Sequence, residues 1–330
     1  MSTAFAPLLA ALALASASAT PPALPAVSAP TPAADAQATE DGDADPLATL
    51  DLGADRAARM TVPVAIGGLS DIPFVVDTGA ERTVVSRQLA ERLQLAPGPV
   101  RRLITVTGTD QVRTVIVPDL EVSGTAIAPI EAPALEAVHI GAAGLLGLDS
   151  LQTRRLVLDF KAGRMTVSAA RKREERRDED MIVVRAKSRF GQLILVDSSI
   201  ENQRIQVIID TGAETSIGNL ALLRRLGNRH RAGPLLPVGL TSVTGDTISA
   251  QFAHIRQIRI GGLTINNLPV AFTDAEPFRR FGLADRPAML LGMDALRLFS
   301  RVSVDFANKQ VRFVRGGSSA LPARTELAAR

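Results

Sequence analysis

Short apolar runs separated by turn-forming residues dominate the chain from residue 47 onward. Residues 61–66 and 72–76 are mostly β-branched or aliphatic, and the Gly67-Gly68 pair between them predicts a β-hairpin. A second pair of runs, residues 192–196 and 204–209, flanks a turn near Asn202 in the same way. These run lengths and this punctuation predict a mainly β protein.

Two segments have helical spacing instead. Residues 86–93 place Leu89 and Leu93 on one face, and residues 219–226 have a similar pattern of leucines. We expect one short helix in each segment, with its leucines in the core.

The chain contains an internal duplication. The block FVVDTGAE at residues 74–81 recurs as VIIDTGAE at residues 207–214. Three further blocks recur in the same order: VTG at 106–108 and 243–245, LLGLD at 145–149 and LLGMD at 290–294, and an apolar strand ending in Asp-Phe at 157–160 and 302–306. Two long copies indicate a duplicated unit, because a solenoid would show more and shorter repeats.

The duplication sets the expected domain boundaries. The first half covers residues 47–170 and the second covers residues 181–315. The charged run at 171–180 joins them as a solvated linker. Residues 20–46 are rich in Pro, Ala, Asp and Thr, which predicts a disordered linker or a short propeptide. Residues 316–330 are expected to be a disordered tail.

The first 19 residues have the pattern of a signal peptide. Residues 5–15 form an apolar run that is too short for a permanent membrane anchor, and Ala17-Ser18-Ala19 suits signal peptidase. No Lys or Arg precedes the run, so an Ala-rich disordered leader is the alternative. The pattern predicts an exported bacterial protein, periplasmic or secreted, with no membrane anchor once the signal is removed.

Composition narrows the functional classes. The 330 residues carry a net charge of +3, include 11 Phe, and lack Trp, Tyr and Cys. Scattered basic residues with few aromatic rings disfavour nucleic acid as a partner. The absence of cysteine excludes disulfides and thiolate catalysis. His139, His230 and His254 are too widely separated in sequence to suggest a metal site, and no phosphate-binding glycine pattern occurs, so we expect no cofactor.

The duplicated Asp-Thr-Gly carries the candidate chemistry. Each apolar strand ends in an aspartate, and a pseudo-twofold axis between the copies would bring Asp77 and Asp210 side by side. Two adjacent carboxylates cannot easily both ionise, so they share one proton and titrate as a pair. The ionised member can then activate a water molecule while the protonated member stabilises a developing oxyanion. This chemistry hydrolyses an amide without a metal or a covalent intermediate.

The residues after each aspartate are expected to support the loop. The hydroxyls of Thr78 and Thr211 can bond across to the opposite loop. Glycine allows a sharp turn that brings backbone amides near the carboxylate, and a small alanine lets the two loops pack together. The residues in these two roles are Gly79, Gly212, Ala80 and Ala213.

Each half resembles a retropepsin-like aspartic peptidase, the class that includes retroviral proteases and related bacterial exported proteins. The matching motifs are apolar-Asp-Thr-Gly-Ala and the downstream Leu-Leu-Gly, and the resemblance spans nearly all of residues 60–315. It implies two small β-barrel halves that pair within one chain as a pseudo-dimer, so the protein is expected to be a monomer. In the family the Leu-Leu-Gly strand packs behind the catalytic loop, which implies supporting roles for Gly147 and Gly292.

The resemblance also implies substrate-binding parts. Retropepsins close a β-hairpin flap over the peptide, and the turns around Gly108 and Gly245 are suitable flap tips. An acidic residue after the motif alanine holds the substrate backbone in some members, which makes Glu81 and Glu214 candidates.

This sequence departs from the family pattern in two respects. The chain has no tyrosine for a pepsin-type flap. Asp149 and Asp294 also stand where retroviral enzymes carry an arginine near the downstream glycine, which puts that ion-pair network in doubt.

The sequence therefore predicts an aspartic endopeptidase that cleaves extended peptides with apolar flanking residues at acid to near-neutral pH. The main alternative is a catalytically inactive exported peptide- or protein-binding factor on the same fold, because fold alone does not ensure function. A further alternative is that each half pairs with the same half of another chain. Asp159 and Asp305 also follow apolar strands, but they lack Thr-Gly and are interpreted as hairpin caps before Gly163 and Asn308.

Overall fold

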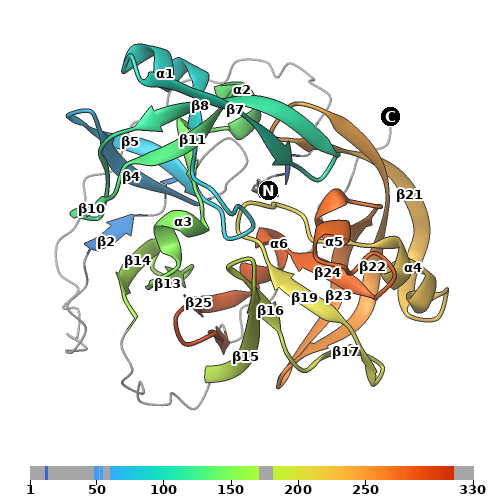
Figure 1. Ribbon diagram of the computed structural model, residues 1–330. Helices are drawn as coiled ribbons and strands as arrows, with labels where there is room; N and C mark the ends of the chain where they lie inside the picture. Colours follow the sequence, from blue (N-terminus) through green and yellow to red (C-terminus); the bar gives the residue numbers. More distant parts are fainter. Residues whose placement is uncertain (1–11, 14–47, 52, 55–59, 171–180, 316–330) are drawn as a thin grey trace, which may run out of the picture.

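The computed structural model describes residues 12–13, 48–51, 53–54, 60–170 and 181–315. Within these ranges the chain is mainly β, with two sheet bodies that correspond to two tandem protease-like halves. Figure 1 shows the first half in blue and green and the second in yellow to red, side by side. The predicted leader, the linker at 20–46, the charged run at 171–180 and the tail at 316–330 lie almost wholly outside the described residues.

The first half is one sheet in the order β10-β9-β4-β5-β12-β6-β11-β8-β7, with the short β3 pairing to β4. Hairpin β4–β5 turns at Gly67-Gly68, as its sequence predicts. Strand β12 then inserts parallel to β5, with Leu146 opposite Val76. The strands are β3 (Gly53–Ala54), β4 (Met60–Ile66), β5 (Leu69–Val76), β6 (Val84–Ser86), β7 (Ala96–Ile104), β8 (Thr109–Val117), β9 (Leu120–Val122), β10 (Thr125–Ile127), β11 (Ile130–Leu135) and β12 (Gly144–Leu146).

The second half repeats this plan. Its order β19-β24-β20-β23-β22-β21 matches β5-β12-β6-β11-β8-β7, and β24 again lies parallel to the strand that carries the aspartate. The strands are β15 (Met181–Arg189), β16 (Gln192–Leu195), β17 (Ser198–Ile200), β18 (Gln203–Arg204), β19 (Gln206–Ile209), β20 (Ile217–Gly218), β21 (Arg231–Ser242), β22 (Thr247–Ile260), β23 (Leu263–Phe272) and β24 (Ala288–Leu291).

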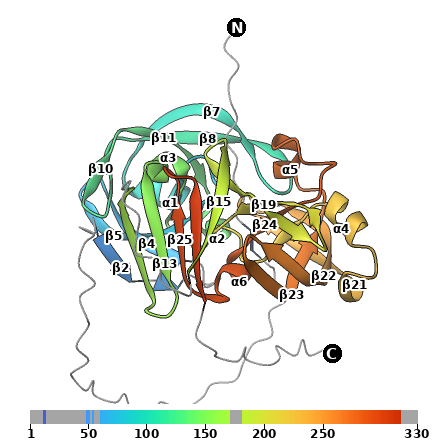
Figure 2. The same ribbon diagram turned by 90° about the horizontal axis from the view of Figure 1, so that it is seen from below.

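A shared antiparallel sheet joins the halves, which the expectation of two separate barrels did not include. Its order is β15-β26-β25-β13-β14-β2, so three strands of the second half continue into three strands of the first through the β25–β13 pairing. One face is apolar and buried, because β13 and β26 alternate buried and more exposed positions, while the central strand β25 is buried from Val302 to Asp305. Figure 2 shows this sheet between the two bodies. The remaining strands are β2 (Ala48–Asp51), β13 (Arg154–Asp159), β14 (Arg164–Ala169), β25 (Phe299–Asp305) and β26 (Gln310–Arg315).

The described helices are short, and two of them, α1 and α4, have side-chain N-caps. The side chains of Ser86 and Asn219 accept hydrogen bonds from the third residue of the helix that follows, at 3.1 and 2.8 Å. These caps explain why the two predicted helices begin where they do. The helices are α1 (Arg87–Arg92), α2 (Ala137–Ile140), α3 (Leu148–Leu151), α4 (Leu220–Leu226), α5 (Glu276–Arg280) and α6 (Met293–Leu296).

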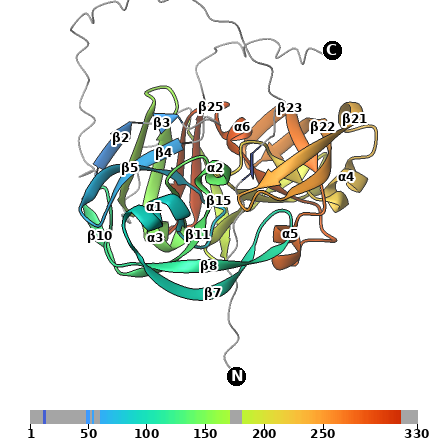
Figure 3. The same ribbon diagram turned by 90° about the horizontal axis from the view of Figure 1, so that it is seen from above.

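Two long hairpins extend from the sheets toward the opposite half. We call β7–β8, with its tip at residues 105–108, the first flap, and β21–β22, with its tip at residues 243–246, the second flap. Figure 3 shows the first flap running across to α5 of the second half. A two-residue strand, β1 (Leu12–Ala13), pairs with the end of β21, with Leu12 opposite Ser242. Among the described residues, no helix has the length and apolar character needed to cross a membrane.

Candidate active site

Asp77 and Asp210 occupy equivalent positions at the ends of β5 and β19. The backbone N–H of Asp77 donates to the carbonyl of Leu146 at 3.0 Å, and that of Asp210 donates to the carbonyl of Leu291 at 3.0 Å. Both carbonyls belong to the inserted parallel strands β12 and β24. Each aspartate is therefore fixed by a buried central strand on one side and a parallel strand on the other.

The two loops interlock through their threonines. The Thr78 Oγ1 donates to the Ile209 carbonyl at 3.0 Å and accepts from the Thr211 N–H at 3.1 Å. The reciprocal bonds of Thr211 reach the Val76 carbonyl at 2.7 Å and the Thr78 N–H at 3.1 Å. Four buried hydrogen bonds thus hold the end of each aspartate strand against the other half.

The two carboxylates are completely buried and each receives backbone hydrogen bonds. The Asp77 Oδ1 accepts from the N–H groups of Gly79 and Ala80 at 2.8 and 3.0 Å. The Asp210 Oδ1 accepts from Gly212 and Ala213 at 3.0 and 3.2 Å. Both side chains have no exposed surface. Backbone amides that converge on a carboxylate stabilise its ionised form.

Glycine is required at positions 79 and 212 because the opposite aspartate side chain lies too close for a Cβ atom, and not because the backbone makes an unusual turn. Neither has a positive φ. A Cβ added to Gly212 would lie 2.2 Å from the Asp77 Cγ, and one added to Gly79 would lie 2.6 Å from the Asp210 Oδ1. Each carboxylate therefore lies directly against the glycine of the opposite loop, which brings the two carboxylates together.

Burial, followed by the neighbouring Asp77 charge, raises the pKa of Asp210 well above its usual range. Hydrogen bonds from Gly212 and Ala213 oppose this rise in pKa only in part. When one buried carboxyl stays protonated beside an ionised one, the two acids share a single proton.

The raised pKa of Asp210 predicts a pH-dependent gain in stability for Asp210→Asn. Below about pH 4 the carboxyl is protonated in both the folded and unfolded states, so its burial has no linked cost. Above that pH the unfolded state ionises first, and wild-type stability falls until the folded-state pKa is passed. Thermal unfolding should show a higher Tm for Asp210→Asn than for wild type at pH 7.5 and little difference near pH 3.5. A variant that is less stable at pH 7.5 would contradict this linkage.

The strands behind the loops form a second layer of support. A Cβ on Gly147 would lie 2.4 Å from the Arg82 carbonyl carbon, and one on Gly292 would lie 2.9 Å from the Ala213 oxygen. The Leu-Leu-Gly segments therefore pack closely on the chain that follows each aspartate. The Ala80 carbonyl also accepts from the Leu148 N–H at 2.9 Å.

Asp149 and Asp294, which stand where retroviral enzymes carry an arginine, form a hydrogen-bond network with hydroxyl side chains. Asp149 accepts from the Thr83 hydroxyl at 2.7 Å, and Asp294 accepts from the Ser216 hydroxyl at 2.7 Å. The Thr83 and Ser216 hydroxyls also accept from the N–H of Gly147 and Gly292, each at 3.1 Å. Burial raises the pKa of Asp294.

We did not predict these hydroxyl–aspartate hydrogen bonds from the sequence, although the sequence contains a repeated pattern that indicates them. A hydroxyl residue stands six positions after Asp77 and after Asp210, and an aspartate follows each downstream glycine by two.

Glu81 is bound within the protein. Arg280 of α5 forms a bidentate ion pair with it, with Nη2 at 2.7 and 2.9 Å from the two carboxylate oxygens. The side chains of Arg280 and Glu81 are only 13% and 16% exposed, and the Arg280 guanidinium also lies 4.4 Å from the centre of the Phe190 ring. Glu81 therefore links the Asp77 loop to the second half, and the substrate contact expected for it stays a prediction. Glu214 lies in the equivalent position, where its carbonyl accepts from the Asp294 N–H at 3.0 Å.

Arg280→Ala is expected to destabilise the protein by about 2 kcal/mol, because it removes three hydrogen bonds to a mostly buried carboxylate. The adjacent Arg279 provides a matched control. It pairs with Asp274 and Glu276 at the surface, and its side chain is 52% exposed. Arg279→Ala should change stability by less than about 0.5 kcal/mol. Urea unfolding of both variants tests the difference, and equal effects would show that the Glu81 contact adds nothing.

The flaps are closed over the carboxylates, and each inserts a valine into the opposite half. Val106 of the first flap is fully buried in a cluster that includes Ile208 and Ala213 of the second half. Val243 of the second flap is 1% exposed in a cluster with Ala80 and other first-half residues. Each flap tip thus packs against the aspartate loop of the opposite half, in a crossed arrangement.

The two predicted flap glycines differ in their surroundings. Gly245 has φ +94°, and a Cβ there would lie 2.4 Å from the Cε1 of His139 in α2 of the first half. Gly108 has φ +157°, and among the described residues no neighbouring atom lies within 4 Å of the position that a Cβ would take there. The glycine of the second flap tip therefore packs against the first half, whereas the glycine of the first flap tip has no such neighbour among the described residues.

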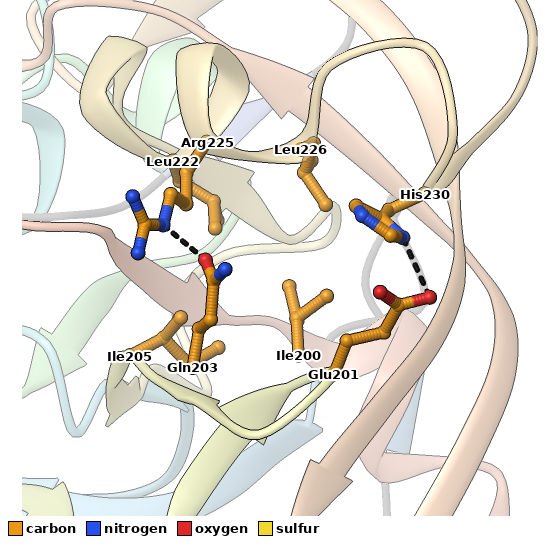
Figure 4. Close-up of a pocket in the computed structure, with 8 residues that line it drawn as sticks. All are labelled: Ile200, Glu201, Gln203, Ile205, Leu222, Arg225, Leu226 and His230. Carbon is orange, nitrogen blue, oxygen red and sulfur yellow. Dashed lines mark hydrogen bonds and ion pairs between the residues drawn. The ribbon is translucent and has the colours of Figure 1, made fainter.

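The other histidines and the paired hairpin aspartates lie away from this centre. His230 pairs with Glu201 at 2.9 Å beside a small hollow under α4, which Figure 4 shows. Its lining residues are Ile200, Glu201, Gln203, Ile205, Leu222, Arg225, Leu226 and His230, so the hollow includes neither aspartate of the pair. Across the described ranges, no group of three or more His, Asp or Glu side chains is placed to hold a metal ion.

Asp159 and Asp305 cap hairpins, as their sequence context predicts. The Asp159 Oδ1 accepts from the Ala162 N–H at 2.8 Å, and the Asp305 Oδ1 accepts from the Asn308 N–H at 2.9 Å.

Two facing carboxylates at the junction of duplicated β units define a site of the aspartic protease class. The model of the aspartyl protease family matches the chain in two stretches, residues 62–150 and 196–295, which together exceed half of its length. This chain belongs to the aspartyl protease family. No curated protein sequence matches it.

Proposed function

We propose that this protein is an aspartic endopeptidase in which Asp77 and Asp210 form one intrachain catalytic dyad. The observation that carries the proposal is the pair of fully buried carboxylates, held by interlocked loops, with the pKa of Asp210 raised by burial and by Asp77. In such a pair one member is a base and the other an acid at the same pH.

The chemistry follows from this assignment of roles. As a water oxygen bonds to the scissile carbonyl carbon, the ionised aspartate takes a proton from the water. The protonated aspartate gives its proton to the carbonyl oxygen. When the C–N bond breaks, the first aspartate passes its proton to the leaving amine. The second then regains a proton from the hydroxyl as the new carboxyl group forms.

The substrate is an extended peptide that enters when the flaps open. The long hairpins β7–β8 and β21–β22 offer main-chain groups for β-augmentation of such a peptide. We propose apolar flanking residues, because aliphatic side chains dominate the clusters beneath the flaps. We also propose that the protein acts as a monomer, is exported to the periplasm or secreted, and needs no cofactor.

The test is digestion of a diverse peptide mixture from about pH 3 to 8, in water enriched in ¹⁸O, with products identified by mass spectrometry. The proposal expects one ¹⁸O atom in each new C-terminal carboxyl group and a rate that falls at both pH extremes. A folded protein that cleaves no peptide at any pH would favour a binding factor on the same fold. A rate that rises steadily to pH 9 would exclude a shared-proton dyad.

A further inference from the structure

Within the described residues, one side chain contacts the Asp77 loop and has no counterpart at the Asp210 loop. Gln192, at the start of β16 in the second half, is 1% exposed, and its Nε2 donates to the carbonyl oxygen of Gly79 in the first loop. A carbonyl oxygen only accepts, so the amide nitrogen must face it. Besides the interlocking threonines and the Glu81–Arg280 ion pair, this is a third link from the second half to the Asp77 loop.

The position of Gln192 is set by the hairpin that carries it. Gly191 has φ +87° at the turn between β15 and β16. A Cβ there would lie 3.0 Å from the Gln152 Nε2 and 3.1 Å from the Leu148 Cδ1, both in the first half. The turn is therefore packed against the first half, and this packing holds the Gln192 amide at the Gly79 carbonyl.

The Gln192 contact reaches Asp77 through a single peptide group. The Gly79 carbonyl and the Ala80 N–H belong to the same peptide, and that N–H donates to the Asp77 Oδ1 at 3.0 Å. A hydrogen bond accepted by the carbonyl polarises the peptide and strengthens its N–H as a donor. Gln192, the peptide and Asp77 thus form a chain of hydrogen bonds that stabilises negative charge on Asp77.

In the described part of the chain, the Asp210 loop shows no equivalent contact, and the position that matches Gln192 in the first half, Arg59, lies outside the described residues. Among the described residues, no side chain donates to the Gly212 carbonyl. The bonds to the Asp210 Oδ1 from Gly212 and Ala213 are 3.0 and 3.2 Å, against 2.8 and 3.0 Å at Asp77. The Gln192 Oε1 is itself buried, and it has no hydrogen-bond partner in the part of the chain that the structure describes. A buried amide oxygen without a hydrogen-bond partner lowers the stability of the fold, so packing alone does not explain a glutamine at this position.

We propose that Gln192 is a positioning residue that fixes Asp77 as the ionised member of the dyad and leaves Asp210 as the proton carrier. This assignment rests on the proposed peptidase function, because it gives the base and acid roles to particular residues. Asp77 then takes the proton from the attacking water, and Asp210 donates to the carbonyl oxygen.

The first test compares Gln192→Met, which keeps the length of the side chain and removes the donor, with Gln257→Met. Gln257 is an exposed residue whose amide bonds Asn266, so it serves as the matched control. We expect Gln192→Met to move the acidic limb of the kcat/KM profile up by about half a pH unit or more. We also expect it to lower kcat by about 10-fold with KM within about 2-fold. A reduced rate with an unshifted profile would mean that Gln192 is only structural and would overturn the proposal.

The second test does not depend on turnover or on the folding of Gln192→Met. The protein is labelled with ¹³C at the aspartate carboxyl carbon, and the remaining dyad carboxyl is titrated by NMR in Asp210→Asn and in Asp77→Asn. We expect Asp77 alone to titrate at a lower pH than Asp210 alone, and the reverse order would overturn the proposal. If wild type cleaves nothing, the proposed function fails, while this titration still decides the assignment of charge.

Discussion

Asp77→Asn and Asp210→Asn are each expected to lower kcat on a cleaved peptide by about 10³-fold or more. Removing either acid leaves the site without its base or without its proton donor, because the single remaining carboxyl cannot fill both roles at one pH. Asparagine keeps the shape of the side chain and can still accept the loop amide bonds, so the loss measures chemistry and not collapse of the loop.

The control for this experiment is Asp159→Asn. Asp159 caps a hairpin in the shared sheet and takes no part in the dyad, so its replacement should leave kcat within about 2-fold of wild type. Retention of more than about a tenth of wild-type kcat by either dyad variant would remove that aspartate from the mechanism.

A mixing experiment extends the first prediction to the pairing of the halves. If the dyad forms within one chain, an equimolar mixture of Asp77→Asn and Asp210→Asn stays inactive, since neither molecule contains both acids. If the halves paired between chains, the mixture would regain part of the wild-type rate through intact mixed sites. Recovery of activity would therefore reject the intrachain pseudo-dimer.

The second large effect is expected from Gly212→Ala, which should destabilise the protein by about 3 kcal/mol and abolish activity. The added methyl carbon would lie 2.2 Å from the Asp77 Cγ, far inside van der Waals contact. Neither loop can move away freely, because the threonine hydrogen bonds and the parallel strands hold both. The clash must therefore be relieved by separating the halves at the dyad.

Chemical denaturation measures this effect, with Gly262→Ala as the control. Gly262 has ordinary backbone angles, and its added carbon would make a normal 3.6 Å contact with the Ile182 side chain. Its replacement should change stability by less than about 0.5 kcal/mol. A Gly212→Ala variant as stable as this control would show that the two loops are less closely packed than the structure indicates.

The duplicated motifs account for most of what the sequence predicted correctly. A repeated apolar strand, Asp-Thr-Gly and Leu-Leu-Gly are local patterns, so they predicted a mainly β fold, the position of the aspartates at strand ends and the two capped helices. The flap tips were also found, because a glycine among turn-forming residues marks a hairpin at each tip.

Contacts between the halves could not be read from the sequence in the same way. The sequence repeat does not duplicate Gln192, Arg280 or His139. Each of these residues gains its role only from a contact with a residue far away in the chain. The ion pair of Glu81 was not predicted for this reason, since nothing near Glu81 in sequence indicates an arginine 199 positions later. The shared sheet was missed because its strands look like ordinary amphipathic strands within each half.

The crossed valines of the flaps give the closed state a measurable advantage. Withdrawing Val106 or Val243 from the opposite half exposes an apolar side chain, at about 2 kcal/mol each. Each withdrawal makes the open form about 30-fold rarer and weakens the apparent binding of any substrate by the same factor. If the protein is the proposed peptidase, a long extended peptide can offset this loss through main-chain hydrogen bonds that a short peptide lacks. The closed flaps would then favour unfolded chains over small peptides as substrates.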